Sequence, residues 1–312
     1  MSTEKNTIDF AVGGQALLEG VLMRSPNFNV ISVRDPEGKI VQKSEFYQNL
    51  VKRIKILNIP LLRGIISMFE MLLIGTRALN FSSQTALGEK ETKKEKGNAW
   101  ANLSIIFSLV FGLVLALFLF KFVPLLITNF LSRYLPVLND NYLLYNLLDA
   151  CIKTCLFVGY IALMGLVPDL KRVFMYHGAE HKSIMTYENG LPLTVENARK
   201  QIRFHPRCGT SFILLIFVIS IVVFTLIPKN PDFLTNFSLR LLALPLIAGV
   251  SYEVLKLSAK KQNIFFRIVA APGLLMQRLT TSEPDDSMLE VALNSLKIAL
   301  EAEKDYQKQN VL

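Results

Sequence analysis

The stretch LSIIFSLVFGLVLALFLFKFVPLLIT, residues 103–128, contains a single charged side chain, that of Lys121. About 20 apolar residues are enough for a helix to cross the hydrocarbon core of a bilayer. Lys121 is near enough to one end for its ammonium group to reach the headgroups. The stretch therefore predicts a membrane-spanning helix, and it is the clearest one in the chain.

Three more apolar stretches extend this pattern towards the C-terminus, and we expect them to span the membrane as well: residues 143–167, 211–227 and 239–257. The first carries Asp149 and Lys153 four residues apart, a spacing that allows an ion pair inside a helix bundle. The last contains a proline, a glycine and Glu253, so it is expected to face protein or a cavity rather than lipid. About four transmembrane helices, within residues 103–257, are the predicted core of the fold.

Composition supports a membrane protein, with 51% hydrophobic residues, 19% charged residues and a mean hydropathy of +0.37. The net charge of +9 comes from basic residues between and beyond the apolar stretches, so topology explains it better than nucleic-acid recognition. Three cysteines form no disulfide framework, which favours a reducing cytoplasmic side. The first ten residues lack the basic-then-apolar pattern of a cleaved signal.

The number of lysine and arginine residues alternates between high and low along the segments outside these helices. Residues 1–102 hold 14 of them, the next loop one, the loop at 169–210 seven, the following loop one and the tail seven. By the positive-inside rule, both termini and the 169–210 loop are expected to be cytoplasmic, in a multi-pass protein of the cytoplasmic (inner) membrane.

The soluble segments are expected at the two ends of the chain. Residues 1–55 predict a cytoplasmic β element, with a hairpin formed by NVISVR and KIVQKSEF around the turn DPEG. The glycine pair at 13–14 could bring the backbone close to a ligand, but its spacing is no phosphate-loop signature, so it is interpreted as turn glycines. Residues 258–312 predict an interfacial or re-entrant segment and then an amphipathic helix. The apolar positions of that helix are Met288, Val291, Ala292 and Leu296.

Between these regions, residues 56–102 predict an amphipathic helix and a charged linker. Arg63, Glu70 and Arg77 recur every seven residues and form one polar stripe with Ser67. The helix could lie in the interface, pack beneath the spanning helices or span the membrane itself. A span would leave eight basic residues outside, which argues against that alternative.

The loop at 169–210 contains all three histidines and one cysteine, in HGAEHKSIMTYENGLPLTVENARKQIRFHPRC (residues 177–208). His177 and His181 share one face of a helix, and His205 and Cys208 form a second pair three residues apart. Mixed nitrogen and sulfur ligands favour zinc. The metal ligands predicted from this pattern are His177, His181, His205 and Cys208.

Glu180 stands within the H-x-x-E-H order of a metalloprotease helix, so it is a candidate catalytic base or a group that fixes an imidazole tautomer. In the alternative interpretation, the histidines cap helices or bind lipid phosphate beside Arg203 and Arg207, and Cys208 is a buried thiol. The site could be closed or open. All four side chains would close a tetrahedral zinc site, whereas two or three of them plus water would leave a reactive position.

Four long motifs resemble the bacterial YqhQ family: GGQALLEGVLMRSP, RGIISMFEMLLIGTRALNFS, HGAEHKSIMTYENGLPLTVENARKQIRFHPRCGTSF and PGLLMQRLTTSEPDDSMLEVAL. This resemblance covers almost the whole chain. It implies a metal-dependent membrane enzyme whose substrate is not defined. By the same resemblance, His177, Glu180, His181, His205 and Cys208 match the family's histidine motif.

The sequence therefore predicts a mainly α membrane protein with a cytoplasmic-face metal site, which acts as a hydrolase on a membrane-associated substrate. The first rival is a scaffold or biogenesis factor with a structural zinc site and a translocon or ribosome as partner. The second is a transporter that would use Asp149, Lys153 and Glu253.

Overall fold

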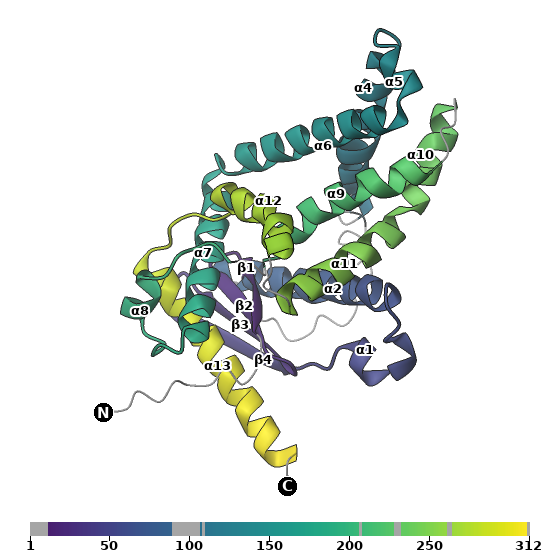
Figure 1. Cartoon of the computed structure of the whole chain (residues 1–312). Coiled ribbons are helices and arrows are strands. Elements are labelled where there is room, and N and C mark those ends of the chain that lie inside the picture. Colours follow the sequence, from purple (N-terminus) through teal and green to yellow (C-terminus); the bar gives the residue numbers. More distant parts are fainter. Residues whose placement is uncertain are drawn as a thin grey trace.

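The computed structural model describes residues 12–88, 107, 110–205, 208–227, 232–260 and 264–310. A four-stranded sheet with its covering helices forms one part of the molecule, and a group of apolar helices forms the other (Figure 1). The charged linker expected at 89–97 and the expected start of the first span at 103 lie outside the described residues.

The sheet is antiparallel, in the order β1-β2-β3-β4. Its strands are β1 (Gly13–Leu17), β2 (Gly20–Arg24), β3 (Phe28–Arg34) and β4 (Ile40–Phe46). The expected hairpin is confirmed, since β3 and β4 pair from Phe28↔Phe46 to Arg34↔Ile40, and Gly38 takes the positive φ of 86° that its turn requires. The interpretation of Gly13 and Gly14 as turn residues was wrong, because both lie in β1 and pair with β2.

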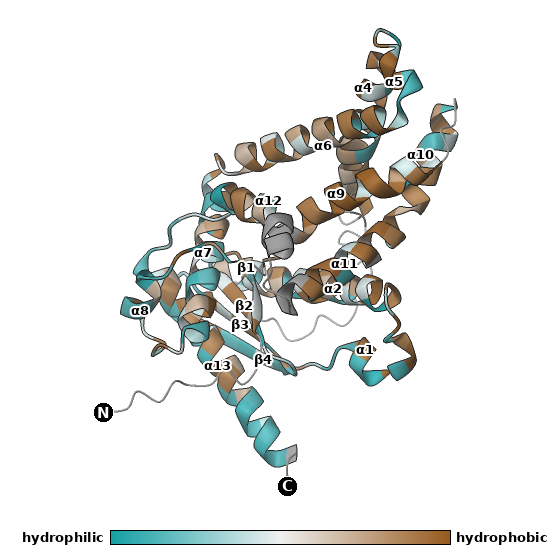
Figure 2. Ribbon diagram, in the orientation of Figure 1, coloured by the Kyte–Doolittle hydropathy of each residue, from teal (hydrophilic) through white to brown (hydrophobic). Residues whose placement is uncertain are grey.

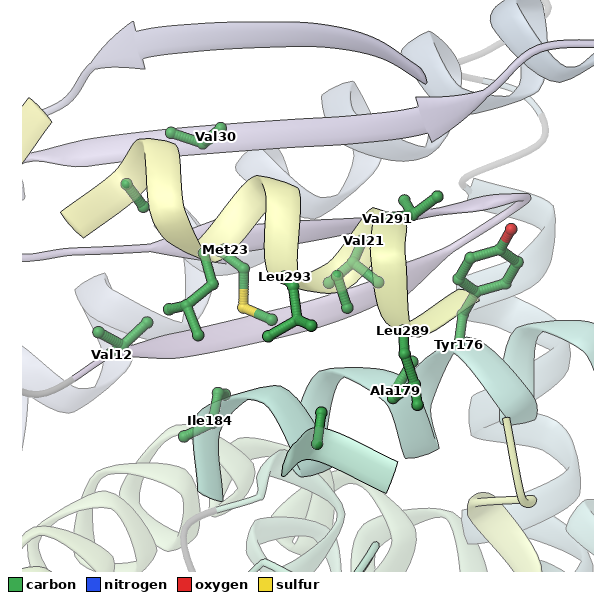
Figure 3. Packing of buried hydrophobic residues seen from close by; sticks show 14 of the residues in the cluster. Val12, Val21, Met23, Val30, Tyr176, Ala179, Ile184, Leu289, Val291 and Leu293 are labelled. Carbon is green, nitrogen blue, oxygen red and sulfur yellow. The ribbon is translucent and has the colours of Figure 1, made fainter. Parts of the chain in front are cut away.

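Helices cover both faces of the sheet. The β2 side chains alternate in direction, as a strand requires. Val21 and Met23 pack with α7 (Pro168–Glu188) and α13 (Asp286–Asn310), whereas Leu22 packs with α2 (Leu62–Ala86) (Figure 3). The apolar face expected for α13 is confirmed, because all four of its positions are buried: Met288, Val291, Ala292 and Leu296. Each large side chain buried in this way contributes about 1.5–3 kcal/mol.

Among the residues that the structure describes, three helices are long and apolar enough to cross a membrane: Val110–Leu131, Tyr142–Met164 (α6) and Phe233–Leu257. The first contains the π-helical turn η2 (Phe118–Phe122) and α4 (Val123–Leu131). The last contains α10 (Phe233–Leu242) and most of α11 (Leu244–Lys260). The fourth expected span corresponds to α9 (Gly209–Leu226), whose apolar part, Phe212–Leu226, is shorter. These helices carry most of the apolar colour in Figure 2.

The amphipathic helix expected from residue 56 is α2, which follows α1 (Leu50–Arg53) and the short 3₁₀ turn η1 (Lys55–Leu57). Three of the four residues of its polar stripe, Arg63, Ser67 and Glu70, lie against protein, whereas Arg77 is exposed. Glu70 is buried and accepts a 2.7 Å hydrogen bond from the backbone N–H of Leu50. Arg63 donates to Glu253 of α11, with 2.6 Å between Nε and Oε1. Helix α2 therefore joins the sheet to the apolar helices, and it is not among the three candidate spans that the described residues contain.

The remaining described elements are the short helices α5 (Val137–Asp140) and α8 (Val195–Arg199) and the longer helix α12 (Ile264–Thr280). Helices α5 and α8 are single turns, and Thr194 caps α8 by accepting from the N–H of Asn197. The interfacial segment expected after residue 258 contains α12, a helix that includes Pro272 and packs against α9.

Candidate metal centre

Helix α7 brings His177 and His181 together. They lie one turn apart on the same face, and their ring centroids are 4.4 Å apart. The helix packs closely on the segment that follows α12, because a Cβ at Gly178 would lie 2.2 Å from the carbonyl oxygen of Ser282. This close approach brings the end of α12 within reach of His177.

Cys208 reaches this pair from the start of α9. Its Sγ lies 3.2 Å from Nε2 of His177. One ligand atom from each of His177, His181 and Cys208 falls within 4.8 Å of the other two. His181 and Cys208 are buried, whereas His177 is partly exposed. Cys208, which lies 27 positions after His181 in the sequence, is therefore close to both histidines of α7.

The hydrogen bonds of both imidazoles leave the same nitrogen available for a ligand. Nδ1 of His177 lies 2.8 Å from the carbonyl oxygen of Thr280, and Nδ1 of His181 lies 2.6 Å from that of Arg203. A carbonyl oxygen only accepts, so each Nδ1 carries the proton and each Nε2 keeps its lone pair, which in His177 faces the Cys208 thiol at 3.2 Å. Backbone carbonyls often orient metal-binding imidazoles in this way.

Nε2 of His181 is the atom that best tests whether a metal fits. It is buried and has no hydrogen-bond partner among the described residues. A buried polar atom without a partner carries a desolvation cost, which a bound cation removes. Burial lowers the pKa of His181, while the nearby Cys208 thiol acts in the opposite direction. The neutral imidazole that a metal requires is therefore favoured.

His205 lies beside the group of three but outside it. Its ring centroid is 5.6 Å from that of His181, and its Nε2 is 3.2 Å from Oε2 of Glu188. Gln277 of α12 holds the backbone of His205, accepting from its N–H and donating to its carbonyl oxygen, each at 2.7 Å. The role of His205 as a fourth ligand thus stays a prediction.

Glu180 points from α7 towards strand β1. Its side chain is 6% exposed, and burial raises the pKa of its carboxyl group, against the effect of the His177 and His205 imidazoles. A Cβ at Gly14 would lie 2.8 Å from Cγ of Glu180 and 2.9 Å from its Oε1. The absence of a side chain at Gly14 is what allows this carboxyl group to lie against the strand.

Gly14→Ala is therefore expected to lower the free energy of unfolding by about 1–3 kcal/mol, because the added methyl group overpacks the contact with Glu180. Gly13→Ala is the matched control, since a Cβ at Gly13 meets nothing within 4 Å, and its effect should stay within about 0.5 kcal/mol. Thermal unfolding of both variants measures the difference. Equal stability of the two would show that the close contact with Glu180 is not formed.

The sequence analysis missed three groups that hold the centre: two backbone carbonyl oxygens and the side chain of Gln277. The carbonyl oxygens of Thr280 and Arg203 act through the backbone, so no side-chain pattern marks them. Gln277 is fully buried and lies within the apolar motif PGLLMQRL, where a lone amide was a usable signal for a buried hydrogen-bonding role. Arg203 lies near the carboxylate of Glu283, and Arg207 lies outside the described residues.

Comparisons with known proteins show which family the chain resembles. Residues 59–302 match the family model "Protein of unknown function (DUF1385)". The chain is also similar to "Uncharacterized protein YqhQ" of Bacillus subtilis (strain 168), with 37% identity over 309 residues, which cover 96% of this chain and 95% of that protein. No solved structure matches.

Proposed function

The chain belongs to the YqhQ (DUF1385) family, and from the geometry of its histidine and cysteine side chains we propose that it is a zinc-dependent, hydrolase-type membrane protein. The observation that carries this proposal is the buried Nε2 of His181, which lacks a hydrogen-bond partner among the described residues, in a group where one ligand atom each of His177, His181 and Cys208 lies within 4.8 Å of the other two. Two imidazoles and one thiolate are a zinc ligand set that leaves the fourth position open.

The roles of the individual residues follow from their positions. His177, His181 and Cys208 would hold the ion, and the carbonyl oxygens of Thr280 and Arg203 would keep the two imidazoles in the correct tautomer. Zinc in an open site supplies a Lewis acid for attack by water on a carbonyl or phosphoryl group. Glu180, one residue before His181, would accept the proton of the attacking water.

The surroundings of the site favour a substrate at the membrane surface. Cys208 directly precedes α9, which is apolar, and Thr280 ends α12, which packs against α9. His177 is the partly exposed member of the group, so access is from its side. A lipid-linked or membrane-protein group near the cytoplasmic headgroups is the substrate class that this position suits.

A cobalt-substituted protein tests whether the site is open. Co²⁺ bound by the Cys208 thiolate should give a charge-transfer band, and adding azide should change the visible spectrum because a fourth position accepts it. An azide-insensitive spectrum would contradict an open site. Cys208→Ser should lose the charge-transfer band, whereas Cys155→Ser, which changes an exposed cysteine on α6, should keep it.

Glu180→Gln tests the proposed proton acceptor. With 4-nitrophenyl acetate as the probe, zinc-dependent hydrolysis is expected to fall by about 10²–10⁴-fold while zinc content stays unchanged. Glu196→Gln is the control, since Glu196 is an exposed glutamate of α8 paired with Lys200. Zinc-dependent hydrolysis that survives in Glu180→Gln would remove Glu180 from the mechanism.

The position of His205 favours a second candidate function. If its ring leaves Glu188 and completes the coordination sphere, the site closes and ties α7 to the segment before α9. The protein would then be a scaffold with a structural zinc ion, and a translocon or ribosome would be the expected partner. The azide experiment separates the two candidates, because a closed site does not respond.

A further inference from the structure

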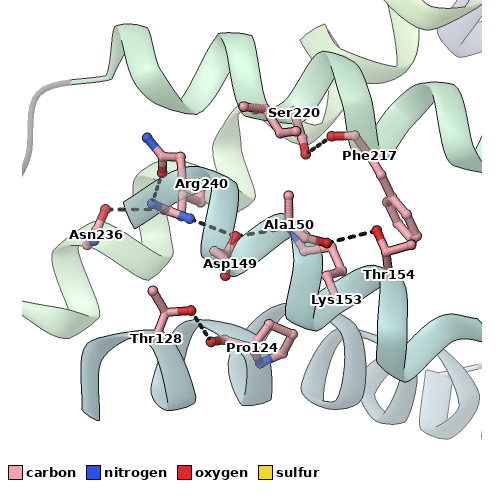
Figure 4. Close-up of polar contacts among 12 residues, drawn as sticks. Pro124, Thr128, Asp149, Ala150, Lys153, Thr154, Phe217, Ser220, Asn236 and Arg240 are labelled. Atoms are coloured by element: carbon pink, nitrogen blue, oxygen red, sulfur yellow. Dashed lines mark hydrogen bonds and ion pairs between the residues drawn. The ribbon is translucent and has the colours of Figure 1, made fainter. Parts of the chain in front are cut away.

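A polar cluster lies among the apolar helices, separate from the metal centre. Asp149 of α6 accepts hydrogen bonds through Oδ2 from Lys153 Nζ at 3.1 Å and from Arg240 Nη1 of α10 at 3.0 Å (Figure 4). All three residues are at most 3% exposed. Arg240 also donates to Asn146 Oδ1 at 2.5 Å. The expected ion pair of Asp149 and Lys153 is confirmed, and Arg240 is a second cation on the same carboxylate.

A third cation adds to this cluster. Lys121, on the π-helical turn η2, lies 4.6 Å from the centroid of the Phe224 ring, and Lys153 and Arg240 lie 5.5 and 4.8 Å from the same centroid. Within the part of the chain that the structure describes, no carboxylate forms an ion pair with Lys121. Three basic side chains therefore share a single carboxylate, so the cluster has more basic than acidic groups.

A surplus of buried charge within apolar helices is costly, and ionisable residues at such positions commonly mark ion or ligand sites. The face of one aromatic ring attracts cations but carries no net charge, so Phe224 offsets only part of the repulsion. The π-helical turn of η2 adds to this evidence, because such turns occur frequently at functional sites.

A cavity lies at the centre of these groups. Its volume is about 10 Å³, and Lys121, Asp149, Lys153, Phe224 and Arg240 are among the residues that line it. A cavity of this size holds one water-sized particle. A phosphate group is too large for it, whereas a chloride ion is only slightly larger than a water molecule.

We propose that this cavity is a binding site for a single chloride-sized anion, held by the ammonium groups of Lys121 and Lys153 beside Phe224. The alternative occupant is a water molecule that donates to Oδ1 of Asp149, an atom without a hydrogen-bond partner among the described residues. Water would leave the surplus of positive charge uncorrected, whereas one anion offsets it at least in part.

Halide binding to the full-length protein tests the proposal. In phosphatidylcholine nanodiscs in gluconate buffer, radioactive chloride should bind saturably at about one ion per chain. Lys121→Met should weaken the apparent affinity for chloride by about tenfold or more, because it removes one charge-assisted donor. Lys256→Met is the matched control, a lysine of similar partial burial on α11 that does not line the cavity, and it should bind chloride as the wild type does.

Three results would overturn the proposal. Wild-type protein that shows no saturable chloride binding would leave water as the occupant. Chloride affinity that is the same in Lys121→Met and wild type would place any bound halide elsewhere. Displacement of chloride by phosphatidylglycerol added to the nanodiscs would assign the positive surplus to a lipid phosphate. None of these results bears on the metal centre, whose ligands lie on α7 and before α9.

Discussion

His181→Ala is expected to reduce the affinity for zinc by far more than about 10–100-fold. That smaller loss is typical when a group that hydrogen-bonds to a metal ligand is removed, rather than the ligand itself. The variant loses the Nε2 atom that is buried without a hydrogen-bond partner among the described residues, and only His177 and Cys208 remain of the group. Zinc per chain, measured by elemental analysis of purified full-length protein, should fall from about one to background.

The control for this loss is a change that leaves the three ligands in place. Cys155→Ser alters an exposed cysteine of α6 and should keep the full zinc content. Circular dichroism and gel filtration of His181→Ala show whether the fold persists. Wild-type zinc content in a folded His181→Ala protein would exclude His181 as a ligand.

Asp149→Ala is expected to lower the free energy of unfolding by about 3–5 kcal/mol, because it removes one partner from a buried ion pair. The carboxylate of Asp149 is the acceptor for both Lys153 and Arg240, and neither cation is more than 3% exposed. The change would leave two buried cations facing each other across the cavity with no carboxylate between them.

Unfolding of the purified protein by increasing amounts of sodium dodecyl sulfate measures this effect. Asp140→Ala, at the exposed end of α5, is the control and should change stability by less than about 0.5 kcal/mol. If Asp149→Ala and Asp140→Ala unfold at the same detergent concentration, the buried network does not support the helix packing described above.

The sequence predicts the apolar helices and the hairpin well, but only part of the sheet. The turn DPEG marks the hairpin of β3 and β4, and β4 is mostly polar because it is exposed on the edge of the sheet. Strand β2 is buried on both faces by α2 on one side and by α7 and α13 on the other. A strand covered on both faces has apolar residues at successive positions, so its sequence shows no alternation of apolar and polar residues.

In the metal site, the sequence predicts the relation between residues on one helix but not the contacts between residues far apart in the chain. The spacing of His177 and His181 on one helix is local, and it predicts their shared face correctly. The position of His205 is set by Gln277, which lies 72 residues further along the chain, and by Glu188. The contact of Gly14 with Glu180 likewise joins β1 to α7. Such long-range contacts have no period or spacing in the sequence.

Zinc K-edge X-ray absorption of the full-length, zinc-loaded protein tests the central claim most directly, because the fine structure counts the atoms bound to the metal by type. We expect one sulfur at about 2.3 Å, two imidazole nitrogens at about 2.0–2.1 Å and one further light atom, as in an open two-histidine, one-cysteine site. A first shell without sulfur, or with a single imidazole, would contradict the assignment of His177, His181 and Cys208 as ligands of one ion.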